Sequence, residues 1–246
     1  MDPNEPLHSQ PRLESVAESE ATFRVVEQAI LGLWKVVNSL SRIRPPGPKY
    51  YRVTIFGSSR MQPGDALYED VRRLTTELAA MGCDIVTGGG PGLMAAANEG
   101  ERLGDVDNRT RSFGLRIELP FEQAANPFVE KLYMHETFFT RLHHFVRLSS
   151  AFIVMPGGIG TTLETMMIWQ LLQVRQIHDR PLVLVGKMWP DLVDWARRHM
   201  LTATPQRADP EDIDLPTCVE TVEEAAAIIR EHHARFRADV GARSSR

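Results

Sequence analysis

Cysteine is scarce in this chain. Among 246 residues there are only two, Cys83 and Cys218, far apart in the sequence and without a Cys-x-x-Cys or Cys/His spacing. This scarcity excludes a disulfide framework and a cysteine-ligated metal site, so we expect no metal. Free cysteines suit a reducing compartment, and we therefore expect a cytoplasmic protein.

Long apolar runs and excess positive charge are also missing. No apolar run reaches the ~18 residues of a membrane-spanning helix, and the N-terminus has no basic segment followed by an apolar one. The formal net charge is -4, so there is no positive field to attract nucleic acid or an anionic membrane. Neither is expected as a partner, and the remaining expectation is a small-molecule substrate.

The length and the 43% of hydrophobic residues are sufficient for one substantial core. We expect an N-terminal extension at 1–48, one Rossmann-like catalytic domain at 49–237 and a disordered tail at 238–246. Within the extension, Phe23, Val26, Ile30 and Leu33 recur at alternating intervals of three and four. This spacing predicts an amphipathic helix from about residue 14 to 41. Packing of this helix on its own domain is favoured over a subunit contact, because the seam is short for a coiled coil.

After residue 50, short apolar runs alternate with helical patterns. Strands are expected at 53–56, 84–87, 112–119, 131–134, 151–155, 181–185 and, weakly, 217–219, with helices near 65–81, 136–149, 161–176, 190–200 and 222–237. Near-continuous apolar strands separated by helices predict a Rossmann-like, doubly wound α/β fold. Its sheet is expected to be largely parallel with helices on both faces. Ligands of such sheets bind beyond the carboxyl ends of the strands.

Three of these strand ends have unusual sequences: Phe56-Gly57-Ser58-Ser59-Arg60, Gly88-Gly89-Gly90-Pro91-Gly92-Leu93-Met94 and Pro156-Gly157-Gly158-Ile159-Gly160-Thr161-Thr162-Leu163-Glu164. Glycine lets backbone N–H groups approach an anion closely, and a following helix N-terminus adds donors and partial positive charge. Two such loops together favour phosphate binding over simple tight turns. Neither loop has the spacing of a Walker A motif or of a dinucleotide-binding motif.

Glu164 has two interpretations. Thr161-x-x-Glu164 matches a capping box, in which both side chains only satisfy donors at a helix N-terminus, and spacing alone favours that role. A carboxylate one helical turn from a phosphate-binding loop would also be useful in catalysis. The spacing leaves both roles open.

The third loop resembles the Pro-Gly-Gly-x-Gly-Thr-x-x-Glu signature of the Lonely Guy family, and the other two loops resemble further motifs of that family. The segment Leu119-Pro120-Phe121-Glu122-Gln123 with Asn126-Pro127 is similar to one in its longer bacterial members. The resemblance covers roughly residues 50–200. It implies a phosphoribohydrolase, which releases the base from AMP or cytokinin nucleotides and needs no cofactor.

The resemblance also implies roles for individual residues. Arg141 and Glu164 match the catalytic arginine and glutamate, while Leu142 stands where the family has a lysine. Breaking a ribosyl–base bond develops positive charge on the sugar, which an ionised Glu164 would stabilise, while Arg141 would hold a polar group of the substrate. The residues expected to bind substrate are Ser58, Arg60, Gly89, Gly90, Gly92, Met94, Asn98, Gly157, Gly158, Gly160, Thr161 and Thr162.

The sequence also bears on three other functions. Decarboxylation, the family's older label, requires a lysine that forms a Schiff base with pyridoxal phosphate, and none of the four lysines lies in the glycine-rich loops. A nucleotide or molybdenum-cofactor carrier of related fold is the alternative, against which the presence of Arg141 and Glu164 argues. A hydrolase acting on another phosphorylated riboside also stays open. The resemblance further implies a homo-oligomer with sites near the subunit interface.

Overall fold

The structure, a computed structural model, describes residues 20–42, 50–118 and 124–244. By its internal contacts the chain divides into two units, Met1–Pro48 and Lys49–Arg246, each described here by itself. Within the described ranges, no helix combines the length and the apolar character needed to cross a membrane.

The described part of the N-terminal unit is one helix, α1, from Glu20 to Arg42. Residues 14–19, where the sequence also predicts helix, lie outside the described residues. Phe23, Val26, Ile30 and Leu33 each expose at least half of their surface. Within this unit taken by itself, the seam predicted from their spacing is therefore an exposed apolar stripe.

The larger unit is built on a sheet of seven strands, in which every neighbouring pair is parallel. The strands are β1 Tyr51–Phe56, β2 Cys83–Thr87, β3 Ser112–Ile117, β4 Lys131–His135, β5 Ala151–Val154, β6 Leu182–Val185 and β7 Pro216–Val219. Their order in space is β4-β3-β2-β1-β5-β6-β7. The chain thus winds outward from β1 to one edge, then returns to β1 and winds outward to the other.

This winding places the topological switch between β1 and β5. At a switch point, the loops after the two central strands diverge to opposite faces, and a crevice opens at their carboxyl ends. The prediction of a doubly wound α/β fold is confirmed. Two of the three unusual loops, those after Phe56 and Val154, follow the two strands at the switch.

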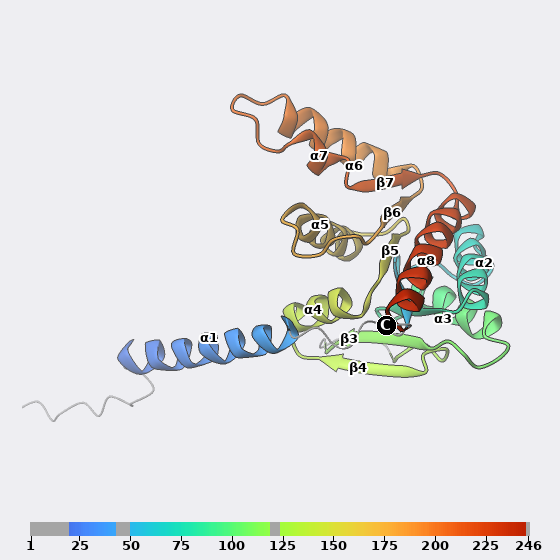
Figure 1. Ribbon diagram of the computed structural model, residues 1–246, viewed down its shortest axis with the longest axis horizontal. Coiled ribbons are helices and arrows are strands. Elements are labelled where there is room, and N and C mark those ends of the chain that lie inside the picture. The colour runs from blue at the N-terminus through green and yellow to red at the C-terminus, as the bar shows by residue number, and fades with distance from the viewer. Residues whose placement is uncertain (1–19, 43–49, 119–123, 245–246) are drawn as a thin grey trace, which may run out of the picture. The chain divides into compact units, whose positions relative to one another are not determined.

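Helices cover both faces of the sheet (Figure 1). They are α2 Ala66–Ala80, α3 Leu93–Gly104, α4 Phe138–Leu148, α5 Ile159–Gln173, α6 Met188–Ala196, α7 Pro210–Ile213 and α8 Val222–Ser244, with a π-helical turn at Arg197–Leu201. Helices α2, α3 and α8 pack on one face, and α4, α5 and α6 pack on the other.

Alternation along the strands supplies a core to each face. In β5, Ile153 lies in the core beneath α2, α3 and α8, whereas Phe152 and Val154 lie in the core beneath α4, α5 and α6. Because successive strand side chains point to opposite faces, a strand buried on both sides is mostly apolar at every position. This requirement explains the unbroken apolar runs of β5 and β6 in the sequence.

Helix α8 and strand β3 end at other residues than the sequence predicts. Helix α8 continues to Ser244, so the segment 238–244, expected to be disordered, is helical. Ala238, Ala242 and Arg243 are strong helix formers, and they allow the helix to propagate past Phe236. Strand β3 ends at Ile117, two residues earlier than expected.

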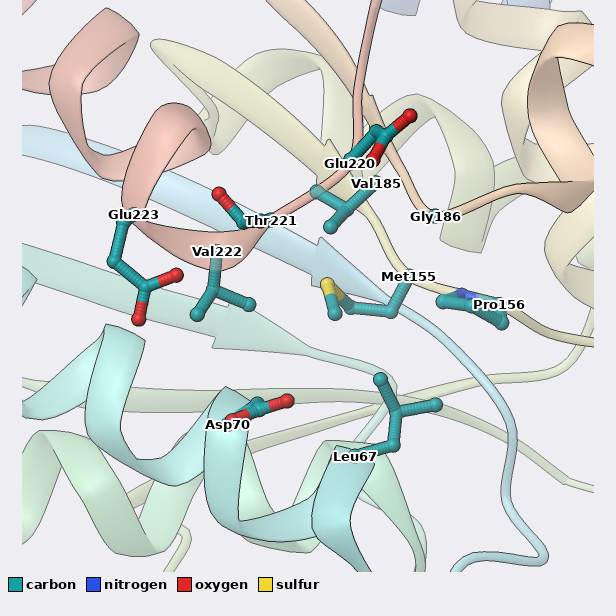
Figure 2. Close-up of a pocket in the computed structure, with 10 residues that line it drawn as sticks. All are labelled: Leu67, Asp70, Met155, Pro156, Val185, Gly186, Glu220, Thr221, Val222 and Glu223. Atoms are coloured by element: carbon teal, nitrogen blue, oxygen red, sulfur yellow. The ribbon is translucent and has the colours of Figure 1, made fainter.

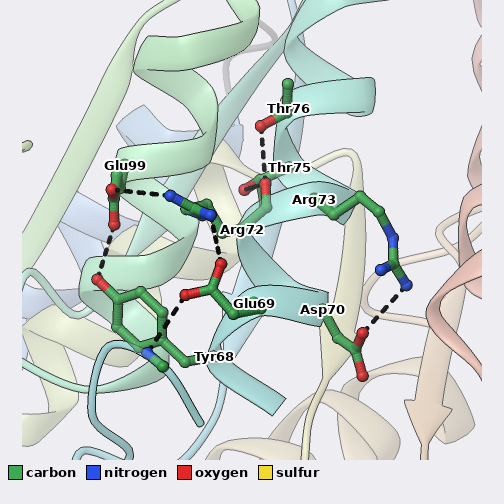
Figure 3. A network of polar contacts seen from close by, with 9 residues as sticks. Tyr68, Glu69, Asp70, Arg72, Arg73, Thr75, Thr76 and Glu99 are labelled. Carbon is green, nitrogen blue, oxygen red and sulfur yellow. Dashed lines mark hydrogen bonds and ion pairs between the residues drawn. The ribbon is translucent and has the colours of Figure 1, made fainter. Parts of the chain in front are cut away.

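Helices α2 and α3 pack closely because of two glycines on α3. A Cβ atom added at Gly100 would overlap the backbone of Arg72, and one at Gly104 would overlap the backbone of Thr76. Polar contacts accompany this packing (Figure 3): the Tyr68 hydroxyl donates to Glu99 Oε2 at 2.8 Å, and Arg72 forms an ion pair with the same carboxylate. These glycines thus serve helix packing.

Candidate active site

The three unusual loops meet at the carboxyl edge of the sheet. The backbone N–H of Ser58 donates to the Pro156 carbonyl at 3.1 Å, and the Ser58 carbonyl accepts from the N–H of Leu93 at 2.9 Å. The loop after β1 is therefore joined to both glycine-rich loops, one on either side. The sequence predicted that these loops would share an edge, and the strand order places them together.

The loop after β2 requires glycine for geometric reasons. Gly89 and Gly92 have φ values of +71° and +69°, a region that side chains rarely adopt. A Cβ at Gly92 would also collide with the Ser58 carbonyl. Gly92 caps α3, so this loop leads directly to a helix N-terminus.

The loop after β5 leads to the second helix N-terminus. Gly158 is the N-cap of α5, and neither Gly158 nor Gly160 has an atom within 4 Å of the position a Cβ would take. The first backbone N–H groups of a helix have no partner within it, and the helix dipole adds positive potential there. This N-terminus is therefore open to an anion of the size of a phosphate.

Arg141 and Glu164 come together beside these loops. Arg141 Nη1, from α4, lies 3.0 Å from Glu164 Oε1, from α5. Arg141 Nε donates to the Leu115 carbonyl at 2.7 Å, and the guanidinium lies 5.1 Å from the centre of the Phe145 ring. Both side chains are largely buried, and the arginine is held by three separate contacts.

Gly88 allows this pair to lie against the first glycine-rich loop. A Cβ at Gly88 would come within 2.6 Å of Arg141 Nη2 and within 2.7 Å of the Met94 sulfur. The guanidinium and the Met94 side chain therefore rest directly on the glycine backbone. The ion pair and the loop form one continuous site.

Helix α5 does not use Glu164 as a cap. The helix begins at Ile159, so Thr161 is its third residue and cannot be the N-cap of a capping box with Glu164. The cap residue is Gly158, and no side-chain bond caps the helix. The carboxylate instead pairs with Arg141, which removes the structural role that spacing alone had favoured.

Burial changes the ionisation of Glu164. It raises the pKa of this carboxyl to about 7, and the neighbouring Arg141 opposes the shift. Desolvation disfavours the charged form, while the guanidinium stabilises it. A carboxyl whose pKa lies near neutral pH can serve in either its charged or its protonated form, which suits a group that handles charge or protons in a reaction.

The two threonines after Gly160 are already engaged within the helix. Thr161 is buried, and its side chain packs against Gly157. The Thr162 hydroxyl donates to the Gly158 carbonyl at 3.1 Å. The backbone N–H groups of this turn are consequently the better donors for a ligand.

Asn98 was expected to bind substrate, and the structure corrects this. Its side chain is fully buried, with Oδ1 accepting from the Thr87 hydroxyl and from Asn126, and Nδ2 donating to Ser112. An amide buried with these partners has no face left for a ligand. Asn126, whose local sequence does not mark it as a site residue, belongs to the same network.

Ser58, Arg60 and Met94 lie at the edge of the loops. The Ser58 hydroxyl accepts from the N–H of Arg60 at 3.2 Å, and Arg60 itself is exposed. Met94 covers Gly88 and Gly90. Leu142, next to Arg141, is half-buried. An apolar side chain thus stands where the family resemblance implies a lysine.

A small cavity of about 160 Å³ lies behind Pro156, on the α2 and α8 side of the sheet (Figure 2). Asp70, Glu220 and Glu223 line its polar part. Their negative charge makes it unsuited to a phosphate. Across the described residues, no cluster of three or more His, Cys, Asp or Glu side chains could hold a metal ion.

The chain matches a family model described as possible lysine decarboxylase over residues 94–229. It is 30% identical over 140 residues to the pyrimidine/purine nucleotide 5′-monophosphate nucleosidase of Escherichia coli K12. That match covers 54% of this chain and 30% of the relative. The chain thus spans less than a third of the length of this curated relative.

Solved structures with similar folds include two proteins that bind or carry the molybdenum cofactor. The molybdenum cofactor binding protein of Rippkaea orientalis is 16% identical, with a TM-score of 0.56 over 75% of this chain and 98% of that one. The molybdenum cofactor carrier protein of Chlamydomonas reinhardtii is 16% identical, with a TM-score of 0.55 over 76% of this chain and 99% of that one. At this identity the likeness is one of fold.

Proposed function

We propose that this chain, which belongs to the Lonely Guy family of possible lysine decarboxylases, hydrolyses the N-glycosidic bond of a purine nucleoside 5′-monophosphate. The observation that carries the proposal is the buried Arg141–Glu164 pair, set against a glycine-rich loop and next to an open helix N-terminus. The nucleosidase relative from Escherichia coli supports the same reaction class. AMP and cytokinin-type nucleotides are the proposed substrates.

The loops would anchor the nucleotide by its phosphate. Backbone donors at Gly90 and Gly160 belong to turns that lead to the N-termini of α3 and α5, whereas the Gly89 N–H, also expected to bind the phosphate, already donates to the Thr87 hydroxyl. Such donors bind a dianion without a metal or a lysine. Anchoring the 5′-phosphate here fixes the ribose relative to Glu164, so part of the entropy cost of the reaction is met on binding.

In the proposed reaction, the bond between C1′ and the base nitrogen breaks and its electron pair leaves with the base. Positive charge develops on the ribose, and the oxygen of a water molecule forms the new bond to C1′. The ionised Glu164 carboxylate stabilises this charge or accepts a proton from the water, and the departing base takes up a proton. The products are free base and ribose 5-phosphate, so the atoms balance without a cofactor.

Arg141 has two roles in this scheme. Its charge opposes the effect of burial on Glu164 and so maintains a fraction of the carboxylate in the ionised form at neutral pH. Its guanidinium also lies against Gly88, where it would contact a polar group of the substrate. The bond to the Leu115 carbonyl fixes its position before substrate arrives.

We further propose that the chain acts as a homo-oligomer in the cytoplasm. Apolar side chains are exposed on the helices that carry the pair: Phe139 on α4 is 75% exposed and Ile159 on α5 is 88% exposed. A second copy of the chain would cover such side chains in a homo-oligomer. The free thiols of Cys83 and Cys218 suit a reducing compartment.

The test is to incubate the purified protein with AMP, GMP, CMP and isopentenyl-AMP and to quantify free base and ribose 5-phosphate by chromatography. We expect equimolar base and ribose 5-phosphate from the purine nucleotides. The proposal would be contradicted if AMP, GMP and isopentenyl-AMP all failed to release free base. Tight nucleotide binding without release would identify a carrier instead.

A further inference from the structure

Asn126 holds the first glycine-rich loop from behind. Its backbone N–H donates to the Gly89 carbonyl at 3.0 Å, and its side-chain Nδ2 donates to the Gly90 carbonyl at 2.9 Å. Asn126 is 8% exposed and comes from the segment between β3 and β4. Two successive loop carbonyls are therefore turned toward one buried residue.

The same loop is also held at its base by Thr87, whose hydroxyl is in turn bonded to the side-chain amide of Asn98. The Gly89 N–H donates to the Thr87 hydroxyl at 2.9 Å, and that hydroxyl donates to Asn98 Oδ1 at 2.7 Å. Asn126 Nδ2 also donates to Asn98 Oδ1, at 3.0 Å. One buried network thus fixes both the N–H of Gly89 and the carbonyls of Gly89 and Gly90.

Planarity of the peptide bond gives this arrangement a consequence for binding. In a trans peptide the C=O and the following N–H point in opposite directions. A Gly89 carbonyl held toward Asn126 therefore turns the Gly90 N–H away from Asn126. The Gly90 carbonyl precedes Pro91, which has no N–H, so the Gly90 N–H is the donor whose direction Asn126 sets.

We infer that Asn126, with Asn98 behind it, is a positioning residue that presents the Gly90 N–H to the 5′-phosphate of a nucleoside monophosphate. The inference rests on the proposed function, because it assigns the donors of the proposed phosphate site. Only an amide can fill the position as observed. Asn126 accepts from the Phe128 N–H with Oδ1 at 3.1 Å, while it donates twice with Nδ2.

An isosteric substitution isolates this role. Asn126→Asp retains the shape, the acceptor for Phe128 and the backbone N–H bond to the Gly89 carbonyl. It removes both bonds that Nδ2 donates and sets a carboxylate oxygen against the Gly90 carbonyl. Thr87→Val is a second, uncharged variant that removes the hydroxyl between Gly89 and Asn98. Asn108→Asp is the matched control: Asn108 is an exposed residue at φ +54°, and its Oδ1 accepts from Arg111.

The experiment measures the Kd of AMP and of adenosine by calorimetry at pH 8 for the full chain and the three variants, with Tm as the check of folding. We expect Asn126→Asp and Thr87→Val to weaken AMP binding about tenfold, since hydrogen bonds to a charged group are the strong ones. Adenosine binding should stay within twofold in both. Asn108→Asp should match wild type for both ligands.

Unchanged AMP affinity in a folded variant would overturn the inference, as would an equal loss for AMP and adenosine, which a merely structural role would give. If Asn126→Asp does not fold, the test rests on Thr87→Val, for which the loss of AMP affinity is compared with the loss of adenosine affinity. Wild-type protein that binds no AMP would also overturn it. Wild-type protein that binds AMP but releases no base would overturn only the proposed reaction.

Discussion

Helices α3 and α5 each bury a glutamate, and the two differ in what surrounds it. Burial raises the pKa of Glu101 on α3 to about 7, as it does for Glu164 on α5. Glu101 accepts a hydrogen bond from the Thr110 hydroxyl at 2.8 Å, whereas Glu164 pairs with Arg141 at 3.0 Å. A raised pKa therefore does not by itself identify a catalytic carboxylate.

The glycines of the two helices differ in the same way. Gly100 on α3 is in contact with α2, while Gly160 on α5 faces open space at the helix N-terminus. In α3 the buried acid and the small residue serve packing. In α5 they stand next to a fixed cation and to unpaired helix donors, and this combination makes a site for chemistry.

The largest effect should separate the two glutamates. Glu164→Gln retains size and hydrogen bonding but removes the charge that would face the sugar cation, so kcat for base release from AMP should fall on the order of 10² or more. Glu101→Gln, the matched control, should leave kcat within about twofold. Steady-state kinetics on both folded variants measures this. Near-normal turnover by Glu164→Gln would return this residue to a structural role.

The glycines should separate by stability. Gly100→Ala forces a methyl group into the α2 backbone and should cost about 1–3 kcal/mol, or a few degrees in Tm. Gly160→Ala meets no atom, so its Tm should hold while its affinity for AMP falls, because the methyl group occupies the phosphate space. Calorimetric melting and AMP titration check both variants. Equal losses of Tm would contradict the comparison.

The pH dependence should assign the titrating group. Glu164 must be ionised to stabilise positive charge, and its pKa is raised to about 7. As the pH falls through 7, kcat/KM should therefore decline, with a plateau at higher pH. The decline should persist in Glu101→Gln. Loss of this decline in Glu101→Gln would assign the titrating group to α3 and contradict the role of Glu164.

The smallest effect on catalysis should come from removing helix α1, which lies outside α3 and α5. Deletion of residues 1–44 removes α1 with its exposed Phe23, Ile30 and Leu33. If this stripe pairs with another copy, the mass measured by light scattering should fall while kcat for AMP changes by less than about twofold. An unchanged mass would show that α1 has no part in assembly.

The sequence was sufficient to predict the sheet, because parallel strands buried on both faces leave short, near-continuous apolar runs. The sequence also located the glycine-rich loops, because clustered glycines directly after a strand and before a helix are typical of anion-binding turns. The role of Glu164 depended on where α5 begins. Glu164 could belong to a capping box only if α5 began near Thr161. The helix begins at Ile159, so Glu164 is free to pair with Arg141, and a sequence does not fix a helix end to within two residues.

The contacts of Asn98 and Asn126 could not be predicted from the sequence. These residues are 28 positions apart and meet through the loop between β2 and α3. A buried asparagine has the same local signature as an exposed one, and only the tertiary structure decides which of its atoms find partners. The same limit explains why the sequence predicts a ligand-binding role for Asn98, which the structure buries in this network.

The central claim is that the carboxyl edge binds a nucleotide through its 5′-phosphate and cleaves it there. The most direct measurement is kcat/KM for AMP against adenosine with the wild-type protein, with adenine as the product assayed. The loops at α3 and α5 predict a preference for AMP on the order of 10² or more, because the phosphate would contact charge-favouring donors at two helix N-termini. Equal kcat/KM values for AMP and adenosine would contradict the account.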